Sequence, residues 1–303
     1  MNDYLVYKES LGETPEFLKK YLELDIVKRL KGISLLCGMD YASKYAYDFK
    51  YYISRYDHSL DVALLVWNLS HDKAATLAGL FHDISTPVFS HVIDYMNKDF
   101  VNQESTESKT LEIMESSSLL KKYLKSDGLE LKDIANFKNY SLVDLDRPSL
   151  CADRIDGTIC SGINWTKTIN GFDSKSIVEN LTVIKNDNNK LEIAFKNEKE
   201  ASMFVTLNNE INTITHSNND NYMMLLLADI VRESIKLGIV DYESLYYITE
   251  SEFIDCLEDN LDLSESLKIN WYNFKNIKDI PKIDIPKVKN KIITPIVVEK
   301  HFN

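Results

Sequence analysis

The residues best suited to chemistry are an adjacent histidine and aspartate, His82 and Asp83, that end an apolar run with helical spacing. An imidazole and a carboxylate at a helix end can both turn toward one divalent ion, because the helix need not continue past them. His58 lies upstream and Asp153 downstream, each on a segment with helical periodicity. Two imidazoles and two carboxylates suit Mn, Fe, Ni, Zn or Mg and leave positions open for water and substrate. We therefore predict that these four residues bind one divalent metal ion.

The segments around these residues also resemble a known family. They are SRYDHSLDVALL, AGLFHDISTPVFSHVID and ADRID. In order and in flanking sequence they resemble the HD-domain phosphohydrolases, and among these the deoxynucleoside triphosphate triphosphohydrolases and related bacterial proteins. That branch usually carries R-F-E-H-S-x-G-V, H-D-x-G-H-x-P-F-S-H and D-x-D-[KR]-x-D-Y. The resemblance extends over roughly residues 15 to 295 and implies a helical core that holds a metal ion.

Helices are the elements expected to position the metal ligands. Helix is predicted throughout residues 51–125, where an apolar face begins one turn after His58 and AATLAGLF forms the next helix before Pro87 interrupts it. An entry helix is expected earlier, with a stop at Gly38. A turn at Pro148 should precede a further helix, which carries Asp153.

The second half of the chain should extend this core. Residues 177–196 alternate around an Asn/Asp turn and predict a β-hairpin, and residues 198–260 return to helix. After Trp271 the prolines favour an extended arm, which would either cross a neighbouring subunit of a homo-oligomer or add a strand to its own domain. We thus expect a mainly α fold, with an HD core at 1–175 and a hairpin, helical appendage and arm at 176–303.

Proton transfer is expected from His91 and Asp94, which lie three residues apart on one helical face. In the resembled enzymes the matching pair lies beside the metal, and a carboxylate there should fix the imidazole tautomer and raise its pKa. Two histidines of the family pattern are replaced by Thr86 and Gln103, which can hydrogen-bond a phosphate oxygen but cannot relay a proton near neutral pH. The proton chemistry therefore falls on His91, on Glu104, or on metal-bound water.

Substrate contacts are expected to differ from those of the triphosphatases. Arg55 and Arg154 lie close to the predicted ligands and suit phosphate, although Arg154 could instead pair with a nearby aspartate such as Asp156 or Asp94. Three further family positions that contact the nucleoside carry Leu35, Gly157 and Ser161. The metal-binding residues are thus retained, whereas the specificity is predicted to have changed.

Composition limits the partners. The 303 residues carry a formal net charge of −12, which disfavours nucleic acid as a main partner. No apolar run approaches the ~20 residues that cross a bilayer, and the amino terminus lacks the features of a secretory signal. A cytoplasmic protein that acts on a small phosphorylated compound is expected.

These observations favour a metal-dependent phosphohydrolase acting on a nucleotide or a related phosphate ester or anhydride. The main alternative is a regulatory protein that keeps its metal and pocket but has lost efficient turnover, which the replacements at Thr86 and Gln103 would suit. A di-iron oxygenase would need further histidines after His82 and Asp83, and only His91 and His216 are available.

Overall fold

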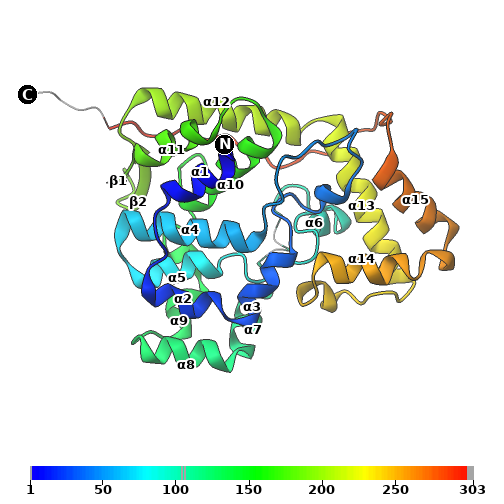
Figure 1. Cartoon of the computed structure of the whole chain (residues 1–303), viewed down its shortest axis with the longest axis horizontal. Coiled ribbons are helices and arrows are strands. Elements are labelled where there is room, and N and C mark those ends of the chain that lie inside the picture. Colours follow the sequence, from blue (N-terminus) through cyan, green and yellow to red (C-terminus); the bar gives the residue numbers. More distant parts are fainter. Residues whose placement is uncertain (1, 104, 106, 299–303) are drawn as a thin grey trace, which may run out of the picture.

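The computed structural model describes residues 2–103, 105 and 107–298, and over this range the protein is mainly helical with one small sheet (Figure 1). Its α-helices are α1 (Asp3–Ser10), α2 (Glu16–Leu22), α3 (Asp25–Lys28), α4 (Arg55–Ser70), α5 (Lys73–Phe81), α6 (Val92–Met96), α7 (Thr110–Ser116), α8 (Ser118–Ser126), α9 (Leu131–Ala135), α10 (Ala152–Trp165), α11 (Gly171–Glu179), α12 (Glu198–Thr215), α13 (Asn218–Lys236), α14 (Glu250–Glu258) and α15 (Glu265–Asn276). Short 3-10 helices are η1 (Arg29–Gly32), η2 (Met39–Tyr41), η3 (Phe137–Asn139), η4 (Glu243–Tyr246) and η5 (Leu261–Leu263). Strands β1 (Leu181–Lys185) and β2 (Leu191–Phe195) form an antiparallel hairpin. The prediction of a mainly α fold with a hairpin is confirmed.

Helix α4 begins at a capping box, which fixes where the first metal-ligand candidate lies. The Ser54 hydroxyl accepts a hydrogen bond from Asp57 N, and the Asp57 carboxylate accepts one from Ser54 N. His58 follows in the first turn. Helices α4, α5 and α10 pack together through an apolar cluster that includes Val62, Ala78 and Ile159, so the ends of the three helices are held rigidly relative to one another.

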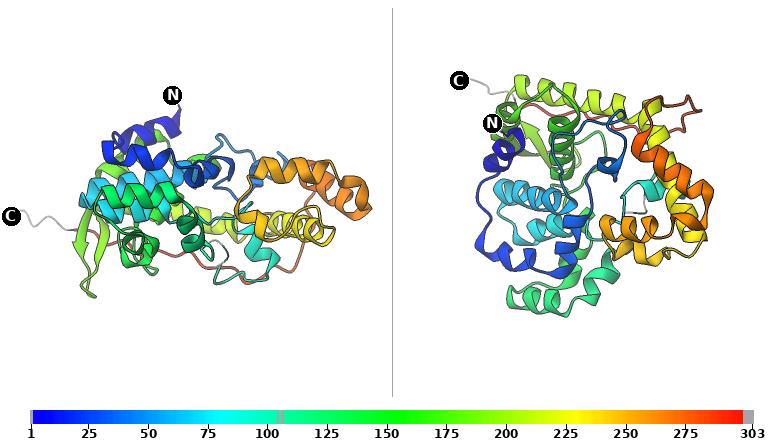
Figure 2. Two further views of the ribbon diagram at one scale, coloured as in Figure 1. Left: turned by 90° about the horizontal axis from the view of Figure 1, so that it is seen from below. Right: turned by 45° about the vertical axis from the view of Figure 1, so that its right-hand side comes forward.

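The second half of the chain shares its core with the first. One apolar cluster joins α4 and α10 to β2 and α12, and another joins residues 88–95 to α13, α14 and α15. Figure 2 shows α13, α14 and α15 gathered on one side of the molecule, beside α6. The appendage therefore packs on the helical core, and a boundary near residue 175 stays a prediction. No helix within the described ranges is both long enough and apolar enough to span a membrane.

The helical predictions were too long in several places, including residues 51–54 and residues 237–249, of which the latter contain only the 3-10 helix η4. The segment 82–91 forms turns rather than helix, because Pro87 interrupts it and Phe89 and Ser90 adopt positive φ angles of 60° and 50°. The described residues of 97–109 also lie outside helices. The entry helix divides into α2 and α3, and residues 177–179 end α11 instead of starting the hairpin. The entry helix also stops earlier than the expected Gly38, because α3 ends at Lys28 and η1 at Gly32. Gly38, with a φ of 73°, instead precedes η2, and an added Cβ there would lie 2.3 Å from the Phe89 ring.

The carboxy-terminal arm, residues 277–298, is extended and lies against its own chain. Phe195 N donates to Ile296 O at 2.8 Å and Val298 N donates to Phe195 O at 2.8 Å, so the arm adds to the edge of β2. Upstream, Lys289 N donates to Phe100 O at 3.0 Å and Thr294 N to Pro148 O at 2.9 Å. Of the two arrangements considered for this segment, the single chain therefore has the one that packs on its own domain. A homo-oligomer stays a prediction.

A buried glutamate should make stability depend on pH. Glu250, at the start of α14, is fully buried and its Oε1 accepts from Ser34 N at 3.1 Å. Burial raises the pKa of Glu250 from 4.5 to about 8. Since the folded protein holds this proton more tightly than the unfolded chain, the stabilisation is complete below pH 4.5 and is lost as the pH rises to about 8.

As the pH rises from 5 to 8, the free energy of unfolding should therefore fall less for Glu250→Gln than for the parent. The difference between the two proteins should change by at most about 1.4 kcal/mol per pH unit. Urea unfolding at several pH values measures it, and parallel curves for the two proteins would contradict the assignment.

Candidate metal centre

Four side chains from three helices converge at one point. His58 lies in the first turn of α4, His82 at the carboxy-terminal cap of α5 with Asp83 directly after it, and Asp153 in the first turn of α10. The two Nε2 atoms lie 3.2 Å apart, and Asp153 Oδ1 lies 3.1 Å from that of His58 and 3.7 Å from that of His82. Asp83 Oδ2 lies 3.7 Å from both Nε2 atoms. The structure thus brings together all four residues predicted to bind metal.

The hydrogen bonds of both imidazoles turn their Nε2 atoms into this cluster. His58 Nδ1 contacts Asp156 Oδ2 at 2.5 Å, and His82 Nδ1 contacts Gly79 O at 2.7 Å. A carboxylate and a carbonyl only accept, so each Nδ1 carries a proton and a neutral ring presents the Nε2 lone pair. Two lone pairs that face each other at 3.2 Å repel unless a proton or a metal cation lies between them. This arrangement fits a divalent metal ion.

The pKa shifts agree with a site that attracts positive charge. Burial alone would lower the pKa of His58, but the hydrogen bonds to Asp153 and Asp156 outweigh burial and raise this pKa to about 10. Burial also opposes the shift at Asp83, yet the charges of Arg55 and of the two imidazoles hold the pKa of this carboxyl well below its usual range. A bound divalent ion would supply the same positive charge without the protons.

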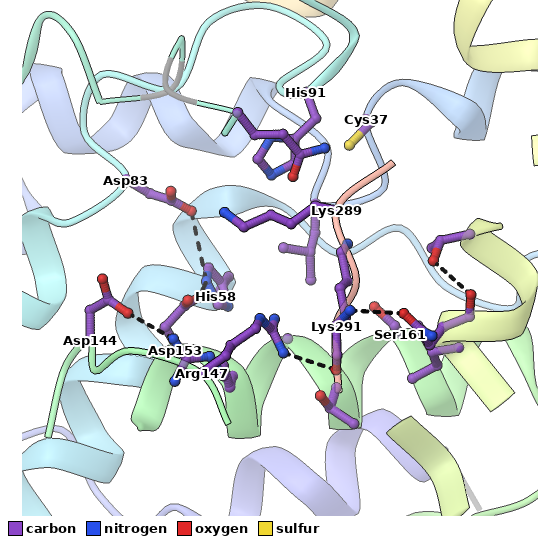
Figure 3. A pocket seen from close by; sticks show the side chains of 18 of the residues that line it. Cys37, His58, Asp83, His91, Asp144, Arg147, Asp153, Ser161, Lys289 and Lys291 are labelled. Carbon is purple, nitrogen blue, oxygen red and sulfur yellow. Dashed lines mark hydrogen bonds and ion pairs between the residues drawn. The ribbon is translucent and has the colours of Figure 1, made fainter. Parts of the chain in front are cut away.

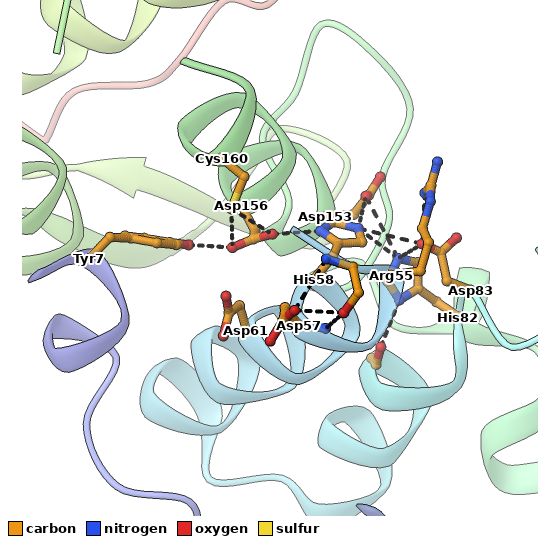
Figure 4. A network of polar contacts seen from close by, with 12 residues as sticks. Tyr7, Arg55, Asp57, His58, Asp61, His82, Asp83, Asp153, Asp156 and Cys160 are labelled. Atoms are coloured by element: carbon orange, nitrogen blue, oxygen red, sulfur yellow. Dashed lines mark hydrogen bonds and ion pairs between the residues drawn. The ribbon is translucent and has the colours of Figure 1, made fainter. Parts of the chain in front are cut away.

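A buried network behind His58 holds this imidazole in place (Figure 4). Asp156 lies one helical turn after Asp153 on α10, and its second oxygen, Oδ1, accepts from the Tyr7 hydroxyl at 2.5 Å. Asp156 and Tyr7 are both fully buried. Sequence reasoning considered Asp156 only as a partner for Arg154. The three-residue spacing from Asp153 could have indicated its role, whereas nothing in the sequence pointed to Tyr7.

Asp156→Asn should weaken metal binding by about 10- to 100-fold, because an amide is a poorer acceptor for the Nδ1 proton of His58 and can present its NH2 group instead. Tyr7→Phe is the matched control, since it removes one hydrogen bond from Asp156 but leaves the carboxylate on His58. We expect a smaller loss for this variant. Metal titration with a competing chelator measures both, and parent-like affinity in Asp156→Asn would show that the contact does not support the site.

Two predicted substrate residues support Asp83. Arg55 is buried, and one of its terminal nitrogens donates to Asp83 Oδ2 at 2.7 Å. Arg55 also lines the adjoining cavity. The Thr86 hydroxyl donates to Asp83 Oδ1 at 3.1 Å, and Thr86 is fully buried behind this carboxylate instead of lining the cavity. Thr86 therefore positions Asp83, in place of the predicted contact with a phosphate oxygen.

The predicted proton-transfer pair is formed, but its electrostatics differ from expectation. His91 Nδ1 contacts Asp94 Oδ2 at 2.9 Å, and His91 lines the cavity. Burial lowers the pKa of His91, and the nearby charge of Arg55 adds to this, so the expected rise caused by Asp94 is outweighed. The ring is then neutral near pH 7 and presents Nε2 as a proton acceptor. Glu104, the other residue considered for proton transfer, lies outside the described residues.

The cluster opens on a cavity of about 660 Å³ (Figure 3). Gln103 and the three altered nucleoside positions, Leu35, Gly157 and Ser161, all line it. Arg154 also lines it, but its terminal nitrogens donate to Ser149 O at 2.6 Å and to Asp144 Oδ1 at 3.2 Å. Arg154 thus pairs with Asp144, and not with Asp156 or Asp94. An added Cβ at Gly157 would meet only His58 Cε1, at 3.9 Å, so this wall is open beside the imidazole.

Comparison with known proteins agrees with this geometry. Residues 55–158, which include all four converging side chains, match the family model of the HD domain. This part of the chain is therefore similar to an HD domain.

Particular relatives are similar over different lengths. The uncharacterized protein YdhJ of Bacillus subtilis is 30% identical over 144 residues, which cover 47% of this chain and 42% of YdhJ. The metal-dependent phosphohydrolase cns2 of Cordyceps militaris is 21% identical over 241 residues, 77% of this chain and 68% of cns2. A crystal structure of a hypothetical protein from Aquifex aeolicus has a TM-score of 0.61 at 16% identity, with 86% of this chain and 71% of that chain covered. The chain thus matches less than half of the length of YdhJ.

Proposed function

We propose that this protein is a metal-dependent phosphohydrolase that acts on a nucleotide or a related phosphate ester or anhydride. The observation that carries the proposal is the convergence of two imidazole Nε2 atoms and two carboxylates on the wall of a cavity that is large enough for a nucleotide. Asp153, with a side chain 41% exposed, makes the cluster reachable from that cavity, whereas His58 is only 1% exposed. The phosphohydrolase name of cns2 supports the same reaction class.

His58, His82, Asp83 and Asp153 would hold one divalent ion of the Mn, Fe, Ni, Zn or Mg group. Such an ion, when bound, polarises a phosphoryl oxygen and lowers the pKa of a bound water. Arg55 keeps Asp83 ionised and oriented through the contact of 2.7 Å. Arg154, held by Asp144, lines the cavity as a permanent positive charge suited to a substrate phosphate.

His91 is the group proposed to move the proton. The carboxylate of Asp94 holds its Nδ1, so that Nε2 is left for the substrate side of the cavity. Because the pKa of His91 is lowered, the free protein is ready to accept a proton there, and the negative charge of a bound phosphate would favour the protonated ring that later releases it. His91 would therefore first accept a proton and then donate it. The sequence-based expectation of a raised pKa had made His91 a proton donor from the start.

The test combines metal analysis of the purified protein with release of phosphate, pyrophosphate or triphosphate across a panel of nucleotides. We expect about one divalent ion per chain and metal-dependent release from at least one class of phosphorylated compound. Stoichiometric metal without release from any member of the panel would favour the alternative described below.

Standard deoxynucleoside triphosphates should be poor substrates. Four residues that recognise them in the resembled enzymes are replaced by Leu35, Thr86, Gly157 and Ser161, of which Thr86 lies behind Asp83 and the other three line the cavity. Each unmade hydrogen bond costs roughly 1–3 kcal/mol of discrimination. Rapid triphosphate release from these nucleotides at micromolar concentration would contradict the prediction.

A second candidate is a regulatory protein that binds metal and nucleotide with little turnover. The position of Thr86 favours it, because this residue supports Asp83 and gives the cavity no second proton-transfer group. Nucleotide binding measured by calorimetry, together with turnover in the same preparation, distinguishes the candidates: tight binding of a compound that is not hydrolysed would favour regulation.

A further inference from the structure

The carboxy-terminal arm brings two lysines into the cavity next to the four metal-ligand candidates, which are called the metal cluster below. Lys289 and Lys291 both line it. In Figure 3 both side chains extend from the arm into the space whose other walls carry Asp83, His58 and Asp153. The arm is therefore part of the cavity wall in addition to bridging the edge of β2 at Val297. Sequence reasoning assigned no role in the site to either lysine.

The arm is anchored on both sides at this point, so the lysine positions are well defined. Lys291 N donates to Asn212 Oδ1 at 3.0 Å, and Lys291 O accepts from Asn208 Nδ2 at 2.9 Å, both on α12. From the opposite side a terminal nitrogen of Arg147 donates to the same Lys291 carbonyl at 2.9 Å. These side-chain contacts to the arm backbone hold it across the cavity.

The positive charges gathered here have no carboxylate in direct contact, and the Lys289 ammonium donates to Asn102 O at 3.2 Å. Within the described residues, neither lysine nor Arg147 forms an ion pair with a carboxylate, whereas Arg154 next to them is paired with Asp144. Asp220 also lines the cavity, where its carboxylate accepts from the Tyr47 hydroxyl at 2.7 Å and offsets part of the Lys291 charge without a direct ion pair. Burial lowers the pKa of Lys291, and the charge of Arg147 lowers it further. In a chain of net charge −12, unpaired cations held close together in a cavity favour an anionic ligand.

We propose that the arm forms an anion-binding subsite in which Lys291, with Lys289 and Arg147, binds a phosphate group of the substrate other than the one at the metal cluster. The inference rests on the proposed function and deepens it, because it assigns the substrate to compounds that carry at least two phosphate groups. Lys291 acts on affinity for the second phosphate and takes no part in proton transfer.

The test measures equilibrium binding by calorimetry, with the full-length protein as purified and magnesium in excess of each probe so that bound metal is retained. The probes are orthophosphate, with one phosphate, and imidodiphosphate, whose P–N–P link resists hydrolysis. Lys291→Met removes the charge with the stem retained, and Lys291→Arg restores the charge. Lys287→Met is the matched control, because Lys287 is an exposed arm residue that does not line the cavity.

The parent should bind imidodiphosphate more tightly than orthophosphate. Lys291→Met should weaken imidodiphosphate binding by about 10- to 100-fold, as expected for a lost charge-assisted hydrogen bond, with little effect on orthophosphate. Lys291→Arg should recover most of this loss, and Lys287→Met should bind both probes like the parent.

Equal imidodiphosphate affinity in Lys291→Met and Lys287→Met would overturn the inference. So would an equal loss for both probes that Lys291→Arg does not recover, because that result indicates only a structural role for the arm. The measurement needs no turnover. A failed hydrolysis panel with an intact dependence on Lys291 would therefore reject the proposed function alone, and hydrolysis without this dependence would reject the subsite alone.

Discussion

Replacing His82 or Asp83 by alanine should remove the metal ion and abolish hydrolysis, while the protein stays folded and mainly helical. Each substitution takes away one of four ligand candidates whose donor atoms lie within 3.1–3.7 Å of an imidazole Nε2. A site reduced to three ligands, with one carboxylate or imidazole lost, binds a divalent ion far more weakly. Elemental analysis after dialysis measures the metal, and circular dichroism measures the helix content.

Asp83→Ala carries a second consequence, because Arg55 donates to this carboxylate and is buried. The uncompensated charge should cost about 3–5 kcal/mol of stability. His82→Ala avoids this cost and is the cleaner variant. His71→Asn is a suitable control: His71 caps the end of α4 with a φ of 52°, which asparagine tolerates, and it lies outside the cluster. Full metal occupancy in both alanine variants would refute the proposed ligand set.

His91→Gln should reduce turnover by about 10²- to 10⁴-fold with metal content unchanged, which is the usual contribution of a proton-transfer group. Glutamine can still hydrogen-bond within the cavity but cannot take up a proton near neutral pH. Because burial lowers the pKa of His91, the activity of the parent should fall on the acidic side as the free ring becomes protonated. The variant should lack this acidic limb.

Gln103→Ala is the control for this prediction. Gln103 also lines the cavity, yet its amide cannot transfer a proton, so its loss should have a much smaller effect on turnover. A reversed order of effects would assign the proton transfer to another group or to solvent. Loss of metal from His91→Gln would instead make His91 a ligand.

The convergence of the four metal-ligand candidates could be predicted because much of its information is local. His58, His82 and Asp153 each lie on or directly after a helix whose apolar periodicity is visible in the sequence, and Asp83 adjoins His82. The contact of 2.9 Å between His91 and Asp94 follows in the same way from a spacing of three residues. The resemblance to HD-domain proteins then supplied the reason for the three segments to meet.

Local patterns were less reliable where the backbone leaves regular structure. Helix was predicted through residues 82–91, but positive φ angles at Phe89 and Ser90 turn the chain there. An earlier turn, in which Thr86 N donates to Asp83 O at 2.9 Å, places Thr86 behind Asp83, so a residue expected to contact substrate supports a ligand candidate instead. The pKa of His91 likewise depends on burial and on charges from other segments, and no spacing of residues reveals these.

Contacts between distant segments determine the features of the site that the sequence did not predict. Tyr7 and Asp156 are 149 positions apart, and Lys291 reaches Asn212 across 79 positions. Periodicity and composition identify helices, an extended arm and its lysines, because these follow from side-chain order along the chain. Whether the arm crosses the cavity, and which charges it brings beside the metal cluster, depends on how α12, the Pro148 turn and the arm pack together. That packing is a property of the whole folded chain and has no local signature.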